Sequence, residues 1–111
     1  MINIEYDEHG RLKHNGERYN AIKELDRKLT EKGIPHEMHK LMDGYQICVP
    51  EKHKENQFEG DAIQHFGSYG AEQDLIEVYG FNLDAPDGYL TVEQALIYFV
   101  KWYKGGAADE K

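Results

Sequence analysis

Cysteine, proline and long hydrophobic runs are all scarce in this sequence. Its single cysteine, Cys48, excludes an internal disulfide framework and any zinc site built from four cysteines, so packing must stabilise the fold. No run of about 18 apolar residues is present, and the first residues lack the basic and then apolar order of a signal peptide. These absences predict a cytoplasmic protein with no membrane partner.

Positive charge is also scarce, with 13 Lys and Arg residues against 21 Asp and Glu residues and a net charge of −8. Because clustered Lys and Arg side chains drive phosphate binding, this balance argues against direct contact with nucleic acid. The 111 residues, of which 40% are apolar, suffice for one small core. We predict a single domain over residues 1–104 and a flexible tail over residues 105–111.

The sequence predicts a small α+β fold in which three helices pack on an antiparallel sheet of three to five strands. The first helix is expected at about 17–32, where apolar residues recur every three or four positions. Similar spacing in residues 75–79 predicts a short second helix. Thr91 and Gln94 form a capping-box pattern that opens a third helix, which Gly105 is expected to end.

The clearest strand signal is a hairpin, in which Asp43-Gly44 forms a two-residue turn between strands at 36–41 and 45–50. Alternation along the second strand places Cys48 on the face opposite the core, where we expect it to be partly exposed or to lie in a second contact. The other expectations are a first hairpin at residues 2–13 around a turn at 7–10, a polar loop at 51–60, a strand at 62–66 and an acidic loop at 82–88. The expected core residues are Ile4, Ile22, Leu25, Leu29, Ile47, Val49, Ile63, Leu75, Ile76, Leu96, Phe99 and Val100.

Acidic residues are concentrated in the second half of the chain. Between Glu55 and Val100 there are nine acids and no Lys or Arg. Such asymmetry creates a negative potential that steers a basic partner, although an acidic surface also serves solubility alone. Tyrosine is a preferred anchor at interfaces, and several tyrosines fall within this segment. The predicted partner-binding residues are Glu72, Asp74, Glu77, Asp84 and Asp87, together with Tyr69 and Tyr89.

A second candidate site is the loop between the predicted strand at 62–66 and the predicted second helix. Free backbone N–H groups at the start of a helix can bind a phosphate. The loop lacks the lysine of a P-loop, and a tight turn alone would also explain its glycines. If a nucleotide binds here, it is expected to contact His65, Gly67, Ser68, Tyr69 and Gly70.

No pattern of metal-ligating or catalytic residues is evident in the sequence. His36 and His39 are three residues apart, and on a strand this spacing sends them to opposite faces. Cys48 and His65 could form a thiol and base pair on neighbouring strands, but no orienting group is evident, and a packed thiol is the simpler interpretation. We therefore predict no metal, no cofactor and no enzymatic activity.

Several short stretches carry a family resemblance. In the second half these are Ser-Tyr-Gly-x-Glu at 68–72, Leu-Ile-Glu at 75–77 and Gly-Tyr-Leu-Thr at 88–91, the last followed by an acidic helix start. The hairpin sequence at 33–47 is similar too. Over about residues 17–104, the chain resembles small proteins encoded by phages and prophages of Firmicutes.

The resemblance implies an accessory protein that binds stoichiometrically to a host protein, one of defence or nucleic-acid handling, and inhibits it. The alternatives are a small-ligand binder that sequesters a nucleotide or nucleotide-derived signal at residues 67–70, and a homodimer with a structural or regulatory role. Two features depart from the family pattern: Val78-Tyr79 replaces the expected Ile-Met, and residues 107–111 have no counterpart.

Overall fold

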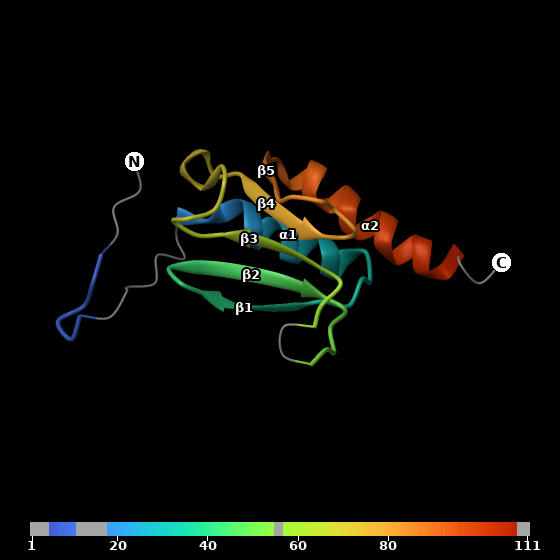
Figure 1. Ribbon diagram of the computed structural model, residues 1–111, viewed down its shortest axis with the longest axis horizontal. Helices are drawn as coiled ribbons and strands as arrows, with labels where there is room; N and C mark the ends of the chain where they lie inside the picture. Colours follow the sequence, from blue (N-terminus) through green and yellow to red (C-terminus); the bar gives the residue numbers. More distant parts are fainter. Residues whose placement is uncertain (1–4, 11–17, 55–56, 109–111) are drawn as a thin grey trace.

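The computed structural model describes residues 5–10, 18–54 and 57–108, with residues 106–108 as backbone only (Figure 1). The Gly10 N–H donates to the Asp7 carbonyl at 3.0 Å, which confirms the predicted first turn. The strand residues predicted on either side of that turn, including the expected core residue Ile4, lie outside the described residues.

Over the described residues the chain forms two α-helices and a five-stranded antiparallel sheet, and this confirms the predicted α+β class. The elements are α1 (Asn20–Glu31), β1 (Glu37–Leu41), β2 (Gly44–Val49), β3 (Gly60–Gln64), the 3-10 turn η2 (Ala71–Gln73), β4 (Ile76–Gly80), β5 (Asp87–Leu90) and α2 (Val92–Ala108). The strands lie in the sheet in chain order. Both helices pack on one face of the sheet, α1 against β2 and β3 and α2 against β4 and β5 (Figure 1). We call this the inner face and the opposite one the outer face.

The segment predicted as a second helix is instead strand β4, so the expectation of three helices is wrong. Ile76 and Val78 are fully buried on the inner face, and Glu77 between them points to the outer face. Apolar residues in so short a run fit the helical period and the strand period equally well. Two β-branched residues and pairing with strands on both sides favour the strand. Likewise, the end of the predicted acidic loop at 82–88 belongs to β5.

Helix α2 begins as predicted and ends later than predicted. The Thr91 N–H donates to Gln94 Oε1 at 2.9 Å and the Gln94 N–H donates to Thr91 Oγ1 at 3.2 Å, so the capping box is confirmed. Gly105 keeps a helical backbone instead of adopting the positive φ that ends many helices, and α2 continues to Ala108. A glycine inside a helix costs only about 1 kcal/mol, which the packing of the preceding turns offsets.

The core lies between the helices and the inner face of the sheet. Most of the predicted core residues are fully buried there: Ile22, Leu25, Leu29, Ile47, Val49, Ile76 and Phe99. Leu96 and Val100 are partly buried against this cluster, and Leu75 is half-buried. Ile63 is half-buried because its position on β3 faces outward. Cys48 is fully buried although it lies on the outer face.

Polar side chains from elsewhere in the chain complete the start of α1. Tyr19 precedes the helix and gives no side-chain cap. Instead, the Ala21 N–H donates to Asp74 Oδ1 and the Ile22 N–H donates to Gln64 Oε1, both at 3.0 Å. Gln64 Nε2 in turn donates to Asp74 Oδ1 at 2.7 Å. The first turn of α1, which would otherwise have unpaired N–H groups, is thus capped by β3 and the loop after η2.

A second buried carboxylate joins the β1–β2 turn to the rest of the fold. Asp43 is fully buried and accepts a hydrogen bond from the Tyr19 hydroxyl at 2.5 Å and another from the Phe66 N–H at 2.9 Å. Both of its oxygens therefore have donors, as a buried carboxylate requires.

Within the described residues, neither helix combines the length and apolar character needed to span a membrane.

Candidate functional site

The outer face of the sheet is polar, and neither helix of the described residues covers it (Figure 1). Strand register aligns its side chains in two rows across the sheet. The first row contains Glu37, Cys48, Asp61 and Tyr79, and the second contains His39, Gln46, Ile63 and Glu77. A polar outer face is usual for an antiparallel sheet whose other face packs on the core, so a site on it must be identified from particular side chains.

Hydrogen bonds connect the β1 end of the two rows. His39 Nε2 lies 2.7 Å from Gln46 Oε1, and Gln46 Nε2 donates to Asp61 Oδ2 at 2.7 Å. On the other side of the cluster, His53 Nε2 lies 2.8 Å from Glu37 Oε1. The other oxygen of Glu37, Oε2, lies 3.4 Å from His39 Nδ1. Each side chain is therefore held in place by a neighbour.

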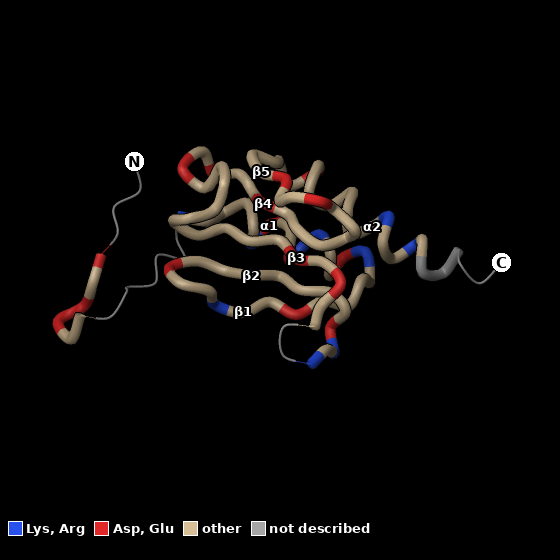
Figure 2. The backbone as a smooth tube through the Cα atoms, in the orientation of Figure 1, with Lys and Arg blue, Asp and Glu red and all other residues tan. Residues whose placement is uncertain are grey.

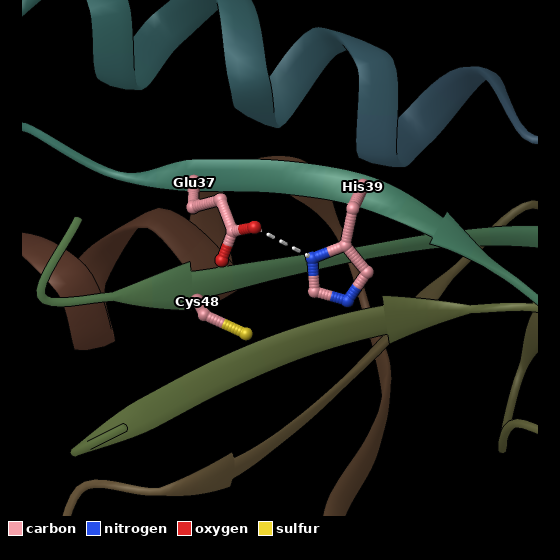
Figure 3. Close-up of side chains that lie close together, drawn as sticks. All are labelled: Glu37, His39 and Cys48. Atoms are coloured by element: carbon pink, nitrogen blue, oxygen red, sulfur yellow. Dashed lines mark ion pairs between the residues drawn. The ribbon is translucent and has the colours of Figure 1, made fainter. Parts of the chain in front are cut away.

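Cys48 also belongs to this cluster. The ligand atoms of Glu37, His39 and Cys48 all lie within 4.8 Å of one another (Figure 3). Burial, with the nearby charges of Asp61 and Glu37, raises the pKa of the Cys48 thiol to about 12. Burial also raises the pKa of Asp61 above its ordinary value, against the bond from Gln46. This side of the sheet thus concentrates negative charge around a neutral thiol.

A cavity opens above the cluster. Its volume is about 700 Å³, and it lies between β1, β2 and the loop that follows β2. Gln46 and Cys48 belong to its floor, and Glu51, His53 and Phe58 line it from the loop. A small ligand can therefore reach Glu37 and His39 from this cavity, whereas Cys48 is buried next to them.

The predicted partner-binding residues do not form one surface. Tyr69 and Tyr89 are exposed, as are Glu72 and Asp84. Asp87 is half-buried and accepts a hydrogen bond from the Tyr98 hydroxyl.

Asp74 and Glu77 have structural roles instead of surface roles. Asp74 caps α1, as described above. Glu77 is buried and accepts a hydrogen bond from the Tyr69 N–H at 2.8 Å. The acidic pattern of the sequence could not reveal these roles, because both bonding partners are distant in the chain or belong to the backbone.

The loop at 67–70 does not provide the geometry that we expected for a phosphate. No α-helix follows it, since η2 has only three residues and β4 comes next. Three of its amide groups already have acceptors: the Gly67 N–H donates to His65 Nδ1, the Ser68 N–H to the His65 carbonyl and the Tyr69 N–H to Glu77. His65 and Ser68 are buried. The loop is therefore a turn held by hydrogen bonds within the fold.

Sequence reasoning missed the cluster of Glu37, His39 and Cys48. The predicted hairpin exists, but its two-residue turn is Met42-Asp43 and Gly44 already belongs to β2, so residue 37 pairs with 48 and residue 39 with 46. A turn at Asp43-Gly44 would have paired residue 39 with 48 and residue 37 with 50, which gives the correct face but a register shifted by two residues. The sequence predicts that His36 and His39 lie on opposite faces, and His36 Nε2 lies 2.6 Å from Asp26 Oδ1 of α1. We paired Cys48 with His65, whereas the register places Cys48 between Glu37 and Asp61.

Comparison of the chain with protein-family models, with curated proteins and with solved structures finds no match in any of the three. The resemblance to phage proteins therefore stays a prediction.

Proposed function

We propose that this protein is a binding protein that acts by one-to-one contact with a second protein carrying a basic surface. The observation that carries the proposal is the placement of Tyr69 and Tyr89, which are 57% and 60% exposed and lie next to each other. A tyrosine offers a rigid apolar face and a polar tip, and both properties are typical of interface anchors.

The backbone holds these two tyrosines in place. The Tyr89 N–H donates to the Tyr69 carbonyl at 3.1 Å. A Cβ atom on Gly88 would lie 2.3 Å from Tyr69 Cβ, and one on Gly70 would lie 2.8 Å from Tyr89 Cα. Glycine at both positions therefore permits the loop and β5 to approach closely. A tyrosine pair fixed in this way loses little conformational entropy when a partner binds.

The surroundings of the tyrosine pair are acidic. Glu72 and Asp84 are exposed near the two segments that carry the tyrosines, and no Lys or Arg occurs in residues 57–100. Figure 2 shows red but no blue along this part of the chain, whereas Lys and Arg lie on α1, β1, the loop after β2 and the end of α2. A basic partner surface is complementary to such a patch.

The resemblance to phage proteins supports a host protein as the partner, one of defence or nucleic-acid handling, with inhibition as the result. A protein that binds nucleic acid presents a basic surface of the required kind. Our proposed contact residues are Tyr69, Tyr89, Glu72 and Asp84, with Asp87 at the edge because its side chain is half-buried and bonds to Tyr98. Asp74 and Glu77 do not belong to this surface, because their side chains bond inside the fold.

The proposal is tested by affinity capture from a lysate of Firmicutes cells, with four tagged versions of the full chain. These are the wild type, Tyr69→Ala/Tyr89→Ala, Glu72→Lys/Asp84→Lys and the control Tyr103→Ala, which removes an exposed tyrosine from the far end of α2. We expect one basic protein, at about equal stoichiometry with the bait, on the wild type and the control only. Raising the salt concentration should release it.

The same experiment distinguishes the alternatives. Recovery of that protein on the double tyrosine variant would contradict the proposed surface. A nucleotide released from the denatured wild-type bait, with no protein captured, would favour the ligand alternative. Light scattering on the purified chain tests the homodimer, for which the two edge strands β1 and β5 are the available sheet edges.

A further inference from the structure

We propose that Glu37, His39 and Cys48 form a binding site for a divalent transition-metal ion of the zinc class. The three side chains converge from two adjacent strands of the outer face, with their ligand atoms within 4.8 Å of one another (Figure 3). The site is separate from the tyrosine pair and does not depend on the function proposed above.

The first argument concerns hydrogen-bond donors around His39. Gln46 uses its amino group as a donor to Asp61, so its Oε1 atom faces His39 and requires a donor. A neutral His39 must then carry its proton on Nε2, which leaves a lone pair on Nδ1. That lone pair faces Glu37 Oε2 at 3.4 Å, and this oxygen has no proton to offer. A proton on His39 Nδ1 or a metal ion between the two atoms makes this contact favourable.

The second argument distinguishes a metal ion from a proton. A proton on His39 Nδ1 would satisfy only the pair with Glu37, whereas the Cys48 sulfur also lies beside them. A divalent ion satisfies all three groups, and its charge balances one carboxylate and one thiolate. The thiol releases its proton to solvent when the ion binds, since a coordinated sulfur is a thiolate.

The donor set also selects the class of metal. A thiolate, an imidazole and a carboxylate suit zinc and similar ions, and the thiolate disfavours calcium and magnesium. Zinc bonds of about 2.0–2.3 Å place tetrahedral ligands about 3.3–3.7 Å apart. His39 Nδ1 and Glu37 Oε2 are already 3.4 Å apart, so only the Cys48 sulfur needs to move a small distance toward these two atoms.

The surroundings resemble those of known metal sites. Metal-binding histidines and carboxylates are held by further hydrogen bonds that fix their orientation. Here Gln46 holds the far nitrogen of His39, and His53 holds the far oxygen of Glu37. Three protein ligands leave a fourth position, which faces the cavity of about 700 Å³. A water molecule or a small ligand in that cavity would complete the coordination.

Cobalt(II) provides the most specific test, because thiolate coordination gives an absorption band in the near ultraviolet and the chain has only one cysteine. The full chain is first treated with a chelator and then titrated with cobalt(II). We expect one equivalent to bind with the thiolate band, and Cys48→Ser to abolish the band. Zinc should displace the bound cobalt. Added to the metal-free chain, zinc should release protons in weakly buffered solution and raise the melting temperature.

Affinity for zinc, measured by competition with a coloured chelator, supplies matched controls. Glu37→Gln and His39→Ala should weaken binding by at least about tenfold. Glu51→Gln removes the same charge from the lining of the same cavity, and should leave the affinity unchanged. Melting curves without metal show whether each variant folds.

Two results would overturn the proposal: cobalt binding without a thiolate band, or equal zinc affinity in Glu37→Gln and Glu51→Gln. If the buried Cys48→Ser variant does not fold, the half-buried positions Glu37 and His39 decide the question.

Discussion

The two faces of the sheet use the same kinds of polar side chain in different ways. On the inner side, Asp43, Gln64 and Asp74 each meet donors or acceptors that match them, so the polar groups are closed pairs within the fold. On the outer side, His39 Nδ1 and Glu37 Oε2 lie 3.4 Å apart beside the Cys48 thiol, where we infer a metal ion. A polar side chain whose donors and acceptors all have partners within the fold has a structural role. A group of ligand atoms that converge on one point is suited instead to holding a further group, such as a metal ion.

The largest expected effect is a loss of stability when a packed side chain on the inner face is truncated. Phe99 is fully buried and its ring lies 5.1 Å from that of Phe81. Phe99→Ala should lower the free energy of unfolding by about 3–5 kcal/mol, because it leaves a cavity in the core. Ile97→Ala, on the same helix at a position 52% exposed, should change it by less than about 0.5 kcal/mol. Urea denaturation measures both.

A conservative change from carboxylate to amide compares the two faces directly. Asp43→Asn should lower the free energy of unfolding by about 1–3 kcal/mol, because the buried Tyr19 hydroxyl loses its acceptor. Asp61→Asn should keep or slightly raise stability at neutral pH, because burial disfavours the ionised Asp61 and an asparagine oxygen can still accept from Gln46. If parallel urea denaturation curves gave equal losses in the free energy of unfolding for the two variants, the proposed difference between the two faces would be wrong.

The smallest effects should appear in the dependence of stability on pH. Burial lowers the pKa of His65 below its ordinary value of 6.5, and its Nδ1 accepts from the Gly67 N–H. A lowered pKa gives stability that is full above the unfolded value and is lost as the pH falls through the folded value. The bonds of His53 to the Lys54 carbonyl and to Glu37 raise its pKa, so its contribution has the opposite sign.

Melting temperatures between about pH 8 and about pH 5 test these signs. His65→Gln should flatten the loss of stability in acid, and His53→Gln should steepen it. His9→Gln changes an exposed histidine at a distance from the sheet and serves as the control. If His65→Gln has the same slope as His9→Gln, His65 is not the group that loses stability in acid.

Local patterns in the sequence predict much of the inner face. Helical spacing locates α1, and the pair of Thr91 and Gln94 locates the start of α2. The Asp43-Gly44 signal locates the hairpin, although the turn itself is one residue earlier, at Met42-Asp43. Each of these signals lies within a few neighbouring residues. The error at β4 also has a local cause, because four apolar positions in five residues are compatible with a helix and with a strand.

The candidate sites depend on relations that are not local. Glu37, His39 and Cys48 converge only because the register of β1 and β2 is fixed by their turn, and the cavity needs the loop after β2 as well. The role of Asp74 depends on a contact with a helix that begins far earlier in the chain. The tyrosine pair was predicted from residue type, but its rigidity depends on the close approach of Gly70 and Gly88 to β5 and the loop.

The capping of α1 has a consequence for the order of folding. Its first turn depends on acceptors that are 53 and 42 residues away in the chain, and an isolated helix of this length is unstable in water. The helix therefore gains its full stability only when β3 and the loop after η2 are in place. Folding of the earliest helix and closure of the sheet are thus one cooperative event, and a chain that ends before residue 74 would lose stability at its opposite end.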